Sequence, residues 1–479
     1  MNSSKLVLST CLLIAVGCAS PPPVAAPPAE PAREPSAAHQ LAALPDNEFV
    51  DFMKEFGLDR NQAMALKLKY KNSTEEDETA MHQPFLYCKQ AGSAALVKLG
   101  MHEQCDRDGE MEQFRQLGER INVVQRKNMA LHAHPEADGK FVHRGFHAKA
   151  HGCLYGKLVV NDPAQRPAWT RVGVFAQQRD FYTWTRFSNG SGLIQGDWNV
   201  EPRGMALKVL GVDGARASFG GLVFEGKTQD FLMTNKPKAT TPDPTTFIEF
   251  AEATAGGMLS TAEFVGSRFW LAKILADLKF NKSWIANVAG IQYWSGVPIS
   301  MGTDASGKMA PVKFFAQPCP DSKYLADADV MKKFSFVDKH INKKNYADYG
   351  RTYLGKMTEK YDICYNIFFQ AQTDPVQTSV EDGLDEWTPE ESKPELVAQL
   401  WMPKQKADFD SKGQNEQCEA MRFNPWNALA DHTPMSDTMQ ARAFVYMSSA
   451  KYREGRDSSG FKQTIEPSET AHPLYRKDH

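Results

Sequence analysis

The stretch that most constrains the fold lies between residues 154 and 234. Short segments rich in Val, Phe, Tyr and Leu follow one another there, separated by glycine and asparagine turns: 154–160, 171–176, 181–188, 205–212, 218–224 and 229–234. Segments of this length and composition are typical of strands rather than helices. So many strands within about eighty residues predict an antiparallel barrel or sandwich at the centre of the chain.

Patterns with a helical period flank this stretch. Apolar side chains recur at helical intervals from Phe49 to Phe56, and further helical segments are predicted at 94–99, 114–124, 245–285 and 437–453. Strand patterns resume at 290–299, 310–315, 367–373 and 396–402. The sequence therefore predicts an α+β fold in which helices surround an antiparallel β-barrel core.

The N-terminus has the pattern of a bacterial export signal. Lys5 precedes a largely apolar run, and the run ends in AVGC at residues 15–18. Small residues before a cysteine resemble a lipobox, which predicts a signal peptide at 1–17 and lipidation of Cys18; a plain signal peptide is the alternative. Residues 18–44 are rich in proline and alanine and predict an extended tether. Ala19 favours an outer-membrane lipoprotein that faces the periplasm or the exterior.

Cysteine content and charge restrict the kind of partner. With Cys11 removed and Cys18 lipidated, an even number of cysteines remains: Cys88, Cys105, Cys153, Cys319, Cys364 and Cys418. An oxidising compartment then allows up to three disulfides, and we favour a bond between Cys88 and Cys105. The net charge of −3 gives no electrostatic reason to expect nucleic acid as a partner.

The segment FVHRGFHAKAHG at 141–152 concentrates histidines. In a helix, His143, His147 and His151 would share one face and could bind zinc, but Gly145 and Gly152 disfavour a helix. In an extended segment, His143 and His147 would point to one side and the residues between them to the other. Zinc is the least favoured interpretation, and we expect His143 and His151 to be surface residues.

Four islands of residues extend this segment along the chain. They are RGFH at 144–147, RFS at 186–188, EPRG at 201–204 with NKP at 235–237, and RAFVY at 442–446 with Arg453 and Gly455. In this order and at these offsets from Tyr446, the islands resemble the heme core of the catalase superfamily, especially its smaller catalase-like members. The resemblance covers residues 141–458. It leaves out the helical region at 45–140 and a polar tail at 459–479.

The resemblance implies a heme b site with a role for each matching residue. Tyr446 would ligate the iron as a phenolate. Since a phenol loses its proton only near pH ~10, a neighbouring cation is needed, and Arg442 lies on the same helix face. His147 would move the peroxide proton, with Ser188 on its far ring nitrogen and Asn235 donating to the peroxide. The matching positions for the heme carboxylates are Arg144, Arg186 and Arg453, whereas Arg203 is expected to be structural.

The expected function follows from this site. The chain resembles a heme-dependent peroxidase of the catalase type that decomposes hydrogen peroxide or an organic hydroperoxide in the bacterial envelope. Rearrangement of fatty-acid hydroperoxides, as in catalase-like allene oxide synthases, and a non-catalytic heme-binding lipoprotein are the alternatives. The chain departs from the family at Phe146, where valine is usual, and after Pro237. Phe247 and Phe250 are candidates for stacking on the heme, and oligomerisation is left open.

Overall fold

A computed structural model describes most of the chain. The described residues are 35–74, 87–89, 96–98, 109–131, 143–199, 201–224, 226–268, 271–280, 284–285, 287–303, 307–334, 347–407, 414–454 and 467–475. The expected signal peptide, Cys18 and residues 459–466 lie outside these ranges. Within the tether predicted at 18–44, Ala37–Ala42 form helix α1. From this helix onward the chain makes one compact unit.

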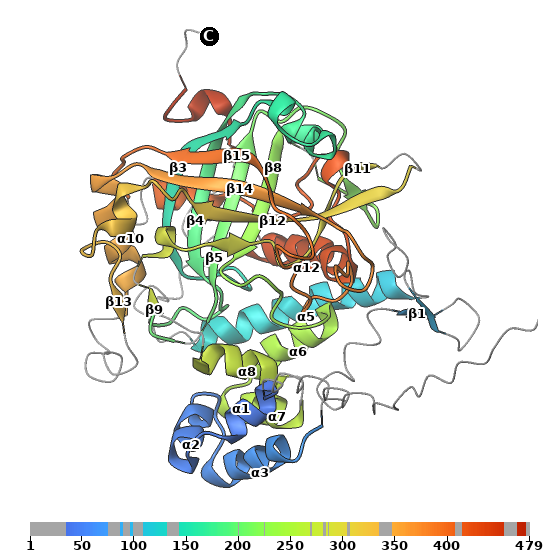
Figure 1. The fold of residues 1–479 in the computed structure, drawn as a ribbon, viewed down its shortest axis with the longest axis vertical. Helices are drawn as coiled ribbons and strands as arrows, with labels where there is room; N and C mark the ends of the chain where they lie inside the picture. The colour runs from blue at the N-terminus through green and yellow to red at the C-terminus, as the bar shows by residue number, and fades with distance from the viewer. Residues whose placement is uncertain are drawn as a thin grey trace, which may run out of the picture. The chain divides into compact units, whose positions relative to one another are not determined.

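The centre of the fold is a closed antiparallel barrel (Figure 1). Its strands are β3 (Ala150–Val160), β4 (Asp180–Asn189), β5 (Arg203–Leu210), β8 (Thr228–Thr234), β10 (Tyr293–Trp294), β12 (Met309–Pro318), β14 (Ile363–Ala371) and β15 (Glu395–Met402). The ring closes because β10 pairs with β8 on one side and with β12 on the other. Strand β11 (Ile299–Thr303) adds to β12 outside the ring. The predicted barrel of an α+β fold is confirmed.

Alternation along the strands separates a barrel interior from an outer face. On β4, Phe181 and Phe187 belong to the apolar cluster that fills the barrel, while Trp184 belongs to a different cluster outside it. On β5, Met205 and Leu207 continue the interior cluster. Successive side chains of a strand point to opposite faces, so the even-numbered residues of β4 face away from the barrel. This outer face carries the site described below.

Many of the helices gather into two groups, each with its own apolar cluster (Figure 1). Helices α5 (Glu110–Leu131), α6 (Pro244–Ala255) and α12 (Asp437–Glu454) share one apolar cluster. A second cluster joins α1, α2 (Asp46–Lys54) and α3 (Arg60–Lys71) to α7 (Met258–Ser267) and α8 (Leu271–Phe280). Side-chain caps start two of these helices, because Asp59 and Asp243 accept hydrogen bonds from backbone N–H groups in the first turns of α3 and α6.

Three local predictions differ from the structure, and one helix was missed. Residues 171–176 are not a strand, since Gly173–Phe175 form a 3-10 turn in which Gly173 has φ +53 and lies against the ring of His432. Residues 218–224 form a separate hairpin, β6 (Ser218–Phe219) with β7 (Leu222–Val223). Instead of a helix at 94–99, β2 (Leu96–Lys98) pairs with β1 (Tyr87–Lys89). Helix α10 (Tyr349–Lys360) was not predicted.

Two disulfides tie distant segments of the described chain together. Cys153 of β3 is bonded to Cys418 of α11 (Gln414–Ala420), across a sequence separation of 265 residues. Cys319 is bonded to Cys364. The predicted bond between Cys88 and Cys105 cannot be placed, because Cys105 lies outside the described residues. A crosslink that closes a long loop reduces the entropy of the unfolded chain and so stabilises the fold.

Membrane spans are absent from the described helices, none of which has the length and apolar character to cross a bilayer.

Buried histidines predict how stability depends on pH. Burial lowers the pKa of His151, His432 and His472 to about 4 each. In the unfolded chain a histidine takes up its proton near pH ~6.5, so between pH ~6.5 and ~4 the unfolded state binds more protons than the folded state. We expect the free energy of unfolding, measured by urea denaturation, to fall as the pH is lowered through this window.

The exchange His472→Gln tests this cause, because its ring is buried and hydrogen-bonded to the carbonyl of Thr183. The variant should show a shallower decline of stability with falling pH. The same exchange at the exposed His39 is the control. An equal slope in all three proteins would contradict the explanation.

Candidate functional site

A cavity of about 1880 Å³ lies at the outer face of β4, β5 and β8, where helix α12 covers it. Ordinary ligand pockets measure roughly 300–1,000 Å³, so this cavity is large enough for a bulky group and a second molecule. His147, Ser188, Asn235 and the predicted residues of α12 all line it. An apolar arm extends between α6, α7 and α8, lined by Phe250, Val265, Leu271, Ile274 and Leu275.

His147 sits in an irregular segment just before β3. Its backbone has φ +55, a left-handed conformation that is uncommon for a residue other than glycine. The backbone N–H of His147 donates to the carbonyl of Gly190 at 3.1 Å, and ring Nδ1 lies 3.0 Å from Ser188 Oγ. The segment is thus neither the helix nor the regular alternation considered from the sequence. The expected contact between His147 and Ser188 is present.

Gly204 makes room for this pair. It is the partner of Ser188 in the register between β4 and β5. A Cβ atom added to Gly204 would lie 2.4 Å from His147 Nδ1 and 2.9 Å from Ser188 Oγ. Gly204, the glycine of the EPRG motif, is therefore needed because a larger residue would collide with the imidazole that packs over it.

The surroundings keep His147 neutral. Burial is the main cause that lowers its pKa to about 3, and the positive charges of Arg186 and Arg442 add to the effect. Above pH ~4 the ring therefore carries one proton and offers one nitrogen lone pair. With Nδ1 at Ser188, Nε2 is the nitrogen left to exchange a proton with a bound molecule.

Helix α12 supplies a phenol on the same cavity. Arg442 Nη2 donates to Tyr446 Oη at 2.9 Å, and Arg442 Cζ lies 5.0 Å from the centre of the Tyr446 ring. Positions four apart share one face of a helix, so the helix itself produces this contact.

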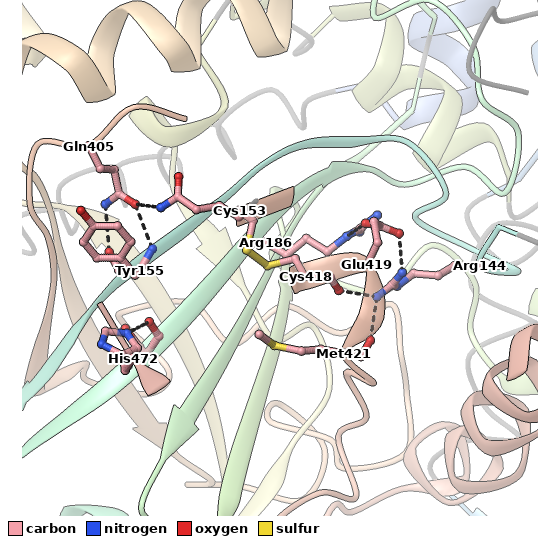
Figure 2. The surroundings of a disulfide bond; sticks show 11 residues. Arg144, Cys153, Tyr155, Arg186, Gln405, Cys418, Glu419, Met421 and His472 are labelled. Carbon is pink, nitrogen blue, oxygen red and sulfur yellow. Dashed lines mark hydrogen bonds and ion pairs between the residues drawn. A yellow bond between two sulfur atoms is a disulfide. The ribbon is translucent and has the colours of Figure 1, made fainter. Parts of the chain in front are cut away.

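Arginines from three separate segments form a cationic cluster on the cavity wall, and Figure 2 shows two of them, Arg144 and Arg186, on either side of Glu419. Arg144 Nη1 and Arg186 Nε donate to the two carboxylate oxygens of Glu419, each at 2.6 Å. Arg453 Nη1 donates to the backbone carbonyl of Glu419 at 3.1 Å. The three arginines predicted to hold carboxylates thus converge, and two of them already bind one.

Asn235 anchors the turn before β5. Its Oδ1 accepts from the backbone N–H of Arg203 at 2.6 Å, and its own N–H donates to the Arg203 carbonyl. The amide nitrogen Nδ2 takes no hydrogen-bond partner among the residues that the structure describes. Because Asn235 lines the cavity, this nitrogen is a donor for a bound molecule.

His151 is fully buried, so its expected position on the surface was wrong. Its Nε2 lies 2.6 Å from Asn189 Oδ1, which also accepts from Arg203 Nη1 at 2.6 Å. Lys149, also fully buried, donates to Asp197 at 2.8 Å, and Asn189 donates to the same carboxylate at 3.1 Å. This network fixes the segment between His147 and β3. Arg203 is held within it by hydrogen bonds to Asn189, Asp197 and Tyr349.

The three histidines do not form a metal site. The backbone carbonyl of His143 accepts from Gln125 Nε2, whereas His147 and His151 bind different partners. No group of three His, Cys, Asp or Glu side chains within the described ranges could hold a metal ion.

Glu419 is the site residue that sequence reasoning missed. It belongs to no motif, and only its position next to Cys418 could have suggested a fixed place in the fold. Glu419 lies far from Arg144 and Arg186 in the sequence, so the sequence does not indicate that they are in contact. The sequence motifs contain Arg144 and Arg186, but Glu419, which neutralises them, lies in a distant helix outside every motif.

Solved structures of catalases resemble the chain. They include a fungal catalase (TM-score 0.53, 16% identity, covering 68% of this chain and 62% of that one), catalase A from Saccharomyces cerevisiae (0.50, 16%, 68% and 64%) and a bacterial catalase (0.50, 18%, 69% and 61%). No protein-family model and no curated protein sequence matches. The chain therefore has a catalase-like fold and spans less than two thirds of the length of these catalases.

The close approach at Gly204 gives a test of the site geometry. In Gly204→Ala, the new methyl group must displace either the His147 ring or Ser188. We expect the hydrogen bond between them to be lost and the free energy of unfolding to fall by about 1–3 kcal/mol, the usual cost of overpacking. The measurements are the ring ¹⁵N resonances of His147 and urea denaturation.

Gly266→Ala is the matched control, since a Cβ there meets no atom within 4 Å. Unchanged His147 resonances in Gly204→Ala would show that the ring does not rest on Gly204.

Proposed function

We propose that the protein is a heme-dependent, catalase-like oxidoreductase that decomposes hydrogen peroxide or an organic hydroperoxide in the bacterial envelope. One observation carries the proposal: a single cavity is lined both by the His147–Ser188 pair and by the Arg442–Tyr446 pair, with the arginine cluster beside them. The resemblance to catalases requires two groups at a heme site: a neutral base, and a phenol with a cationic partner.

The residues present fit heme b. Tyr446 Oη, with Arg442 donating to it, would ligate the iron. The heme carboxylates would bind the cluster of Arg144, Arg186 and Arg453, which accommodates a carboxylate in this structure, that of Glu419. The rings of Phe146 and Phe247 lie 4.6 Å apart between centroids and both line the cavity. They supply an apolar surface for a flat ring.

The side chains of the cavity then divide the work on the peroxide. Heme iron would exchange electrons with the O–O bond. His147 Nε2 takes the proton from one peroxide oxygen and returns it to the other, which a neutral imidazole can do near pH 7. Ser188 Oγ holds the ring through Nδ1, so Nε2 stays available. Asn235 Nδ2 donates to the peroxide and orients it.

The proposed location in the envelope rests on two observations. The sequence before Cys18 resembles a lipobox, so the chain would be anchored to a membrane by lipid. The two disulfides support an oxidising compartment, because such bonds persist in secreted and periplasmic proteins and are rare in the cytosol.

The apolar arm of the cavity favours a second candidate substrate. The arm lies beside the start of α7, where Met258 and Leu259 are 71% and 81% exposed. Exposed apolar side chains next to an apolar cavity suit the entry of a hydrocarbon chain. A fatty-acid hydroperoxide, either reduced or rearranged at the same site, is therefore the alternative to hydrogen peroxide. A non-catalytic heme-binding protein is the remaining alternative.

The absorption spectrum of the purified protein with hemin tests the cofactor. We expect a Soret band and, in Tyr446→Phe, an altered ferric spectrum, because the phenolate ligand is lost. Tyr452→Phe, on the same helix and outside the cavity lining, should keep the wild-type spectrum. Identical spectra for wild type and Tyr446→Phe would exclude Tyr446 as the ligand.

Turnover tests the base. His147→Ala should retain the Soret band and lose peroxide decomposition by about 10²–10⁴-fold, the usual contribution of a general acid–base group. His143→Ala, which removes a nearby histidine outside the cavity lining, should keep full activity. Wild-type rates in His147→Ala would eliminate the proposed mechanism.

Oxygen release separates the substrates. Hydrogen peroxide should yield oxygen. Loss of the conjugated-diene absorbance of a fatty-acid hydroperoxide without oxygen release would favour the second candidate. A heme-loaded protein that turns over neither compound would favour heme binding without catalysis.

A further inference from the structure

Arg186 connects the cationic cluster to the backbone of His147. Its Nε donates to Glu419 Oε1 at 2.6 Å, and its Nη2 donates to the carbonyl of His147 at 2.9 Å. The Arg186 side chain is almost fully buried. One guanidinium therefore holds the histidine segment on one side and Glu419 on the other.

The backbone of His147 needs such support. Its φ of +55 is a conformation that a non-glycine residue keeps only when its surroundings impose it. The N–H of His147 is held by the carbonyl of Gly190, and its carbonyl is held by Arg186. If Arg186 shifts, the carbonyl loses this donor, and the ring over Gly204 loses the geometry that places it at Ser188.

A disulfide sets the position of Glu419. Cys153 of β3 is the direct cross-strand partner of Arg186 on β4. Because Cys153 is bonded to Cys418, the next residue, Glu419, is brought beside Arg186 (Figure 2). Arg144 Nη2 also donates to the Cys418 carbonyl at 2.9 Å, which secures the end of α11.

Glu419 is charged near neutral pH. Burial would raise the pKa of its carboxyl group, but Arg144 and Arg186 outweigh burial and bring the pKa to about 2. Arg144 shows the reverse effect: burial and the neighbouring Arg453 lower its pKa, and Glu419 opposes this. The carboxylate thus stabilises guanidiniums that would otherwise repel one another.

We propose that Glu419 is a positioning residue for His147: through Arg186, it holds the histidine backbone in the conformation that places the ring on Ser188. Glu419 is not among the residues that line the cavity, so it acts through Arg186. The use of the positioned ring in peroxide chemistry rests on the proposed function. The positioning itself can be measured without heme.

Glu419→Ala and Glu419→Gln, compared with Glu416→Ala one turn earlier on α11, test the proposal in the full-length protein. The readouts are the ring ¹⁵N resonances of His147 at pH 7, assigned with His147→Gln, and the rate at which diethyl pyrocarbonate ethoxycarbonylates the His147 ring, measured by mass spectrometry. Glu419→Ala should shift the resonances and raise the ethoxycarbonylation rate about tenfold, the factor that a change of about 1.4 kcal/mol in a local opening equilibrium produces. Glu419→Gln keeps one oxygen acceptor and should show a smaller change.

Wild-type resonances and reactivity in Glu419→Ala overturn the proposal, and so does an equal change in Glu416→Ala. If Glu419→Ala does not fold, the comparison rests on Glu419→Gln, for which wild-type behaviour in both readouts overturns it.

Peroxide turnover then distinguishes this inference from the proposed function. In hemin-loaded protein, Glu419→Ala should lower kcat by up to about 100-fold, the effect of misplacing a reacting group by about 1 Å, with little change in KM. A protein that shows the His147 changes but never forms a Soret band would contradict the proposed function and leave the positioning role intact.

Discussion

The alternation of side chains along β4 is the constraint on which the site depends. One face of this strand fills the barrel with Phe181 and Phe187, while the opposite face presents Arg186 and Ser188 to the cavity. A slip of one residue would bury Arg186 in the barrel and expose Phe187. The packed apolar interior forbids that slip. Barrel packing therefore fixes the position of Ser188 along the strand, where its hydroxyl meets the imidazole of His147. The core thereby determines the geometry of the site.

Charge is balanced around one neutral ring. Burial and two arginines keep the pKa of His147 low, so the base needs no proton-accepting partner to stay neutral. Arg186 and its neighbour Arg144 would destabilise the cavity wall if no anion were present. Glu419 supplies that anion from a helix far away in sequence. The cavity wall thus combines the neutral imidazole of His147 with the guanidinium groups of Arg144 and Arg186. Glu419 holds these guanidinium groups in place.

The sequence predicted those parts of the site whose residues lie close together in the chain. Arg442 and Tyr446 are neighbours on a helix by spacing alone, and the strand pattern around RFS placed Ser188 on a defined face. Glu419 and the burial of His151 were out of reach, because both depend on contacts across more than thirty residues. The turn at Gly173 was misread as a strand for a similar reason: the ring of His432, not local propensity, decides its conformation.

The N-terminal helical region, which the resemblance leaves unmatched, has a physical part in the site. Helix α5 packs closely along α12: a Cβ at Gly118 would meet the Phe444 backbone at 3.1 Å. Next to this contact, Gly145 lies against Ile121 of α5, and its backbone N–H donates to the hydroxyl oxygen of Ser449 on α12. Helix α5 therefore packs against both the segment that bears His147 and the helix that bears Tyr446. The segment that bears His147 and the helix that bears Tyr446 thus share one support, so α5 restricts the positions of both side chains although neither belongs to it.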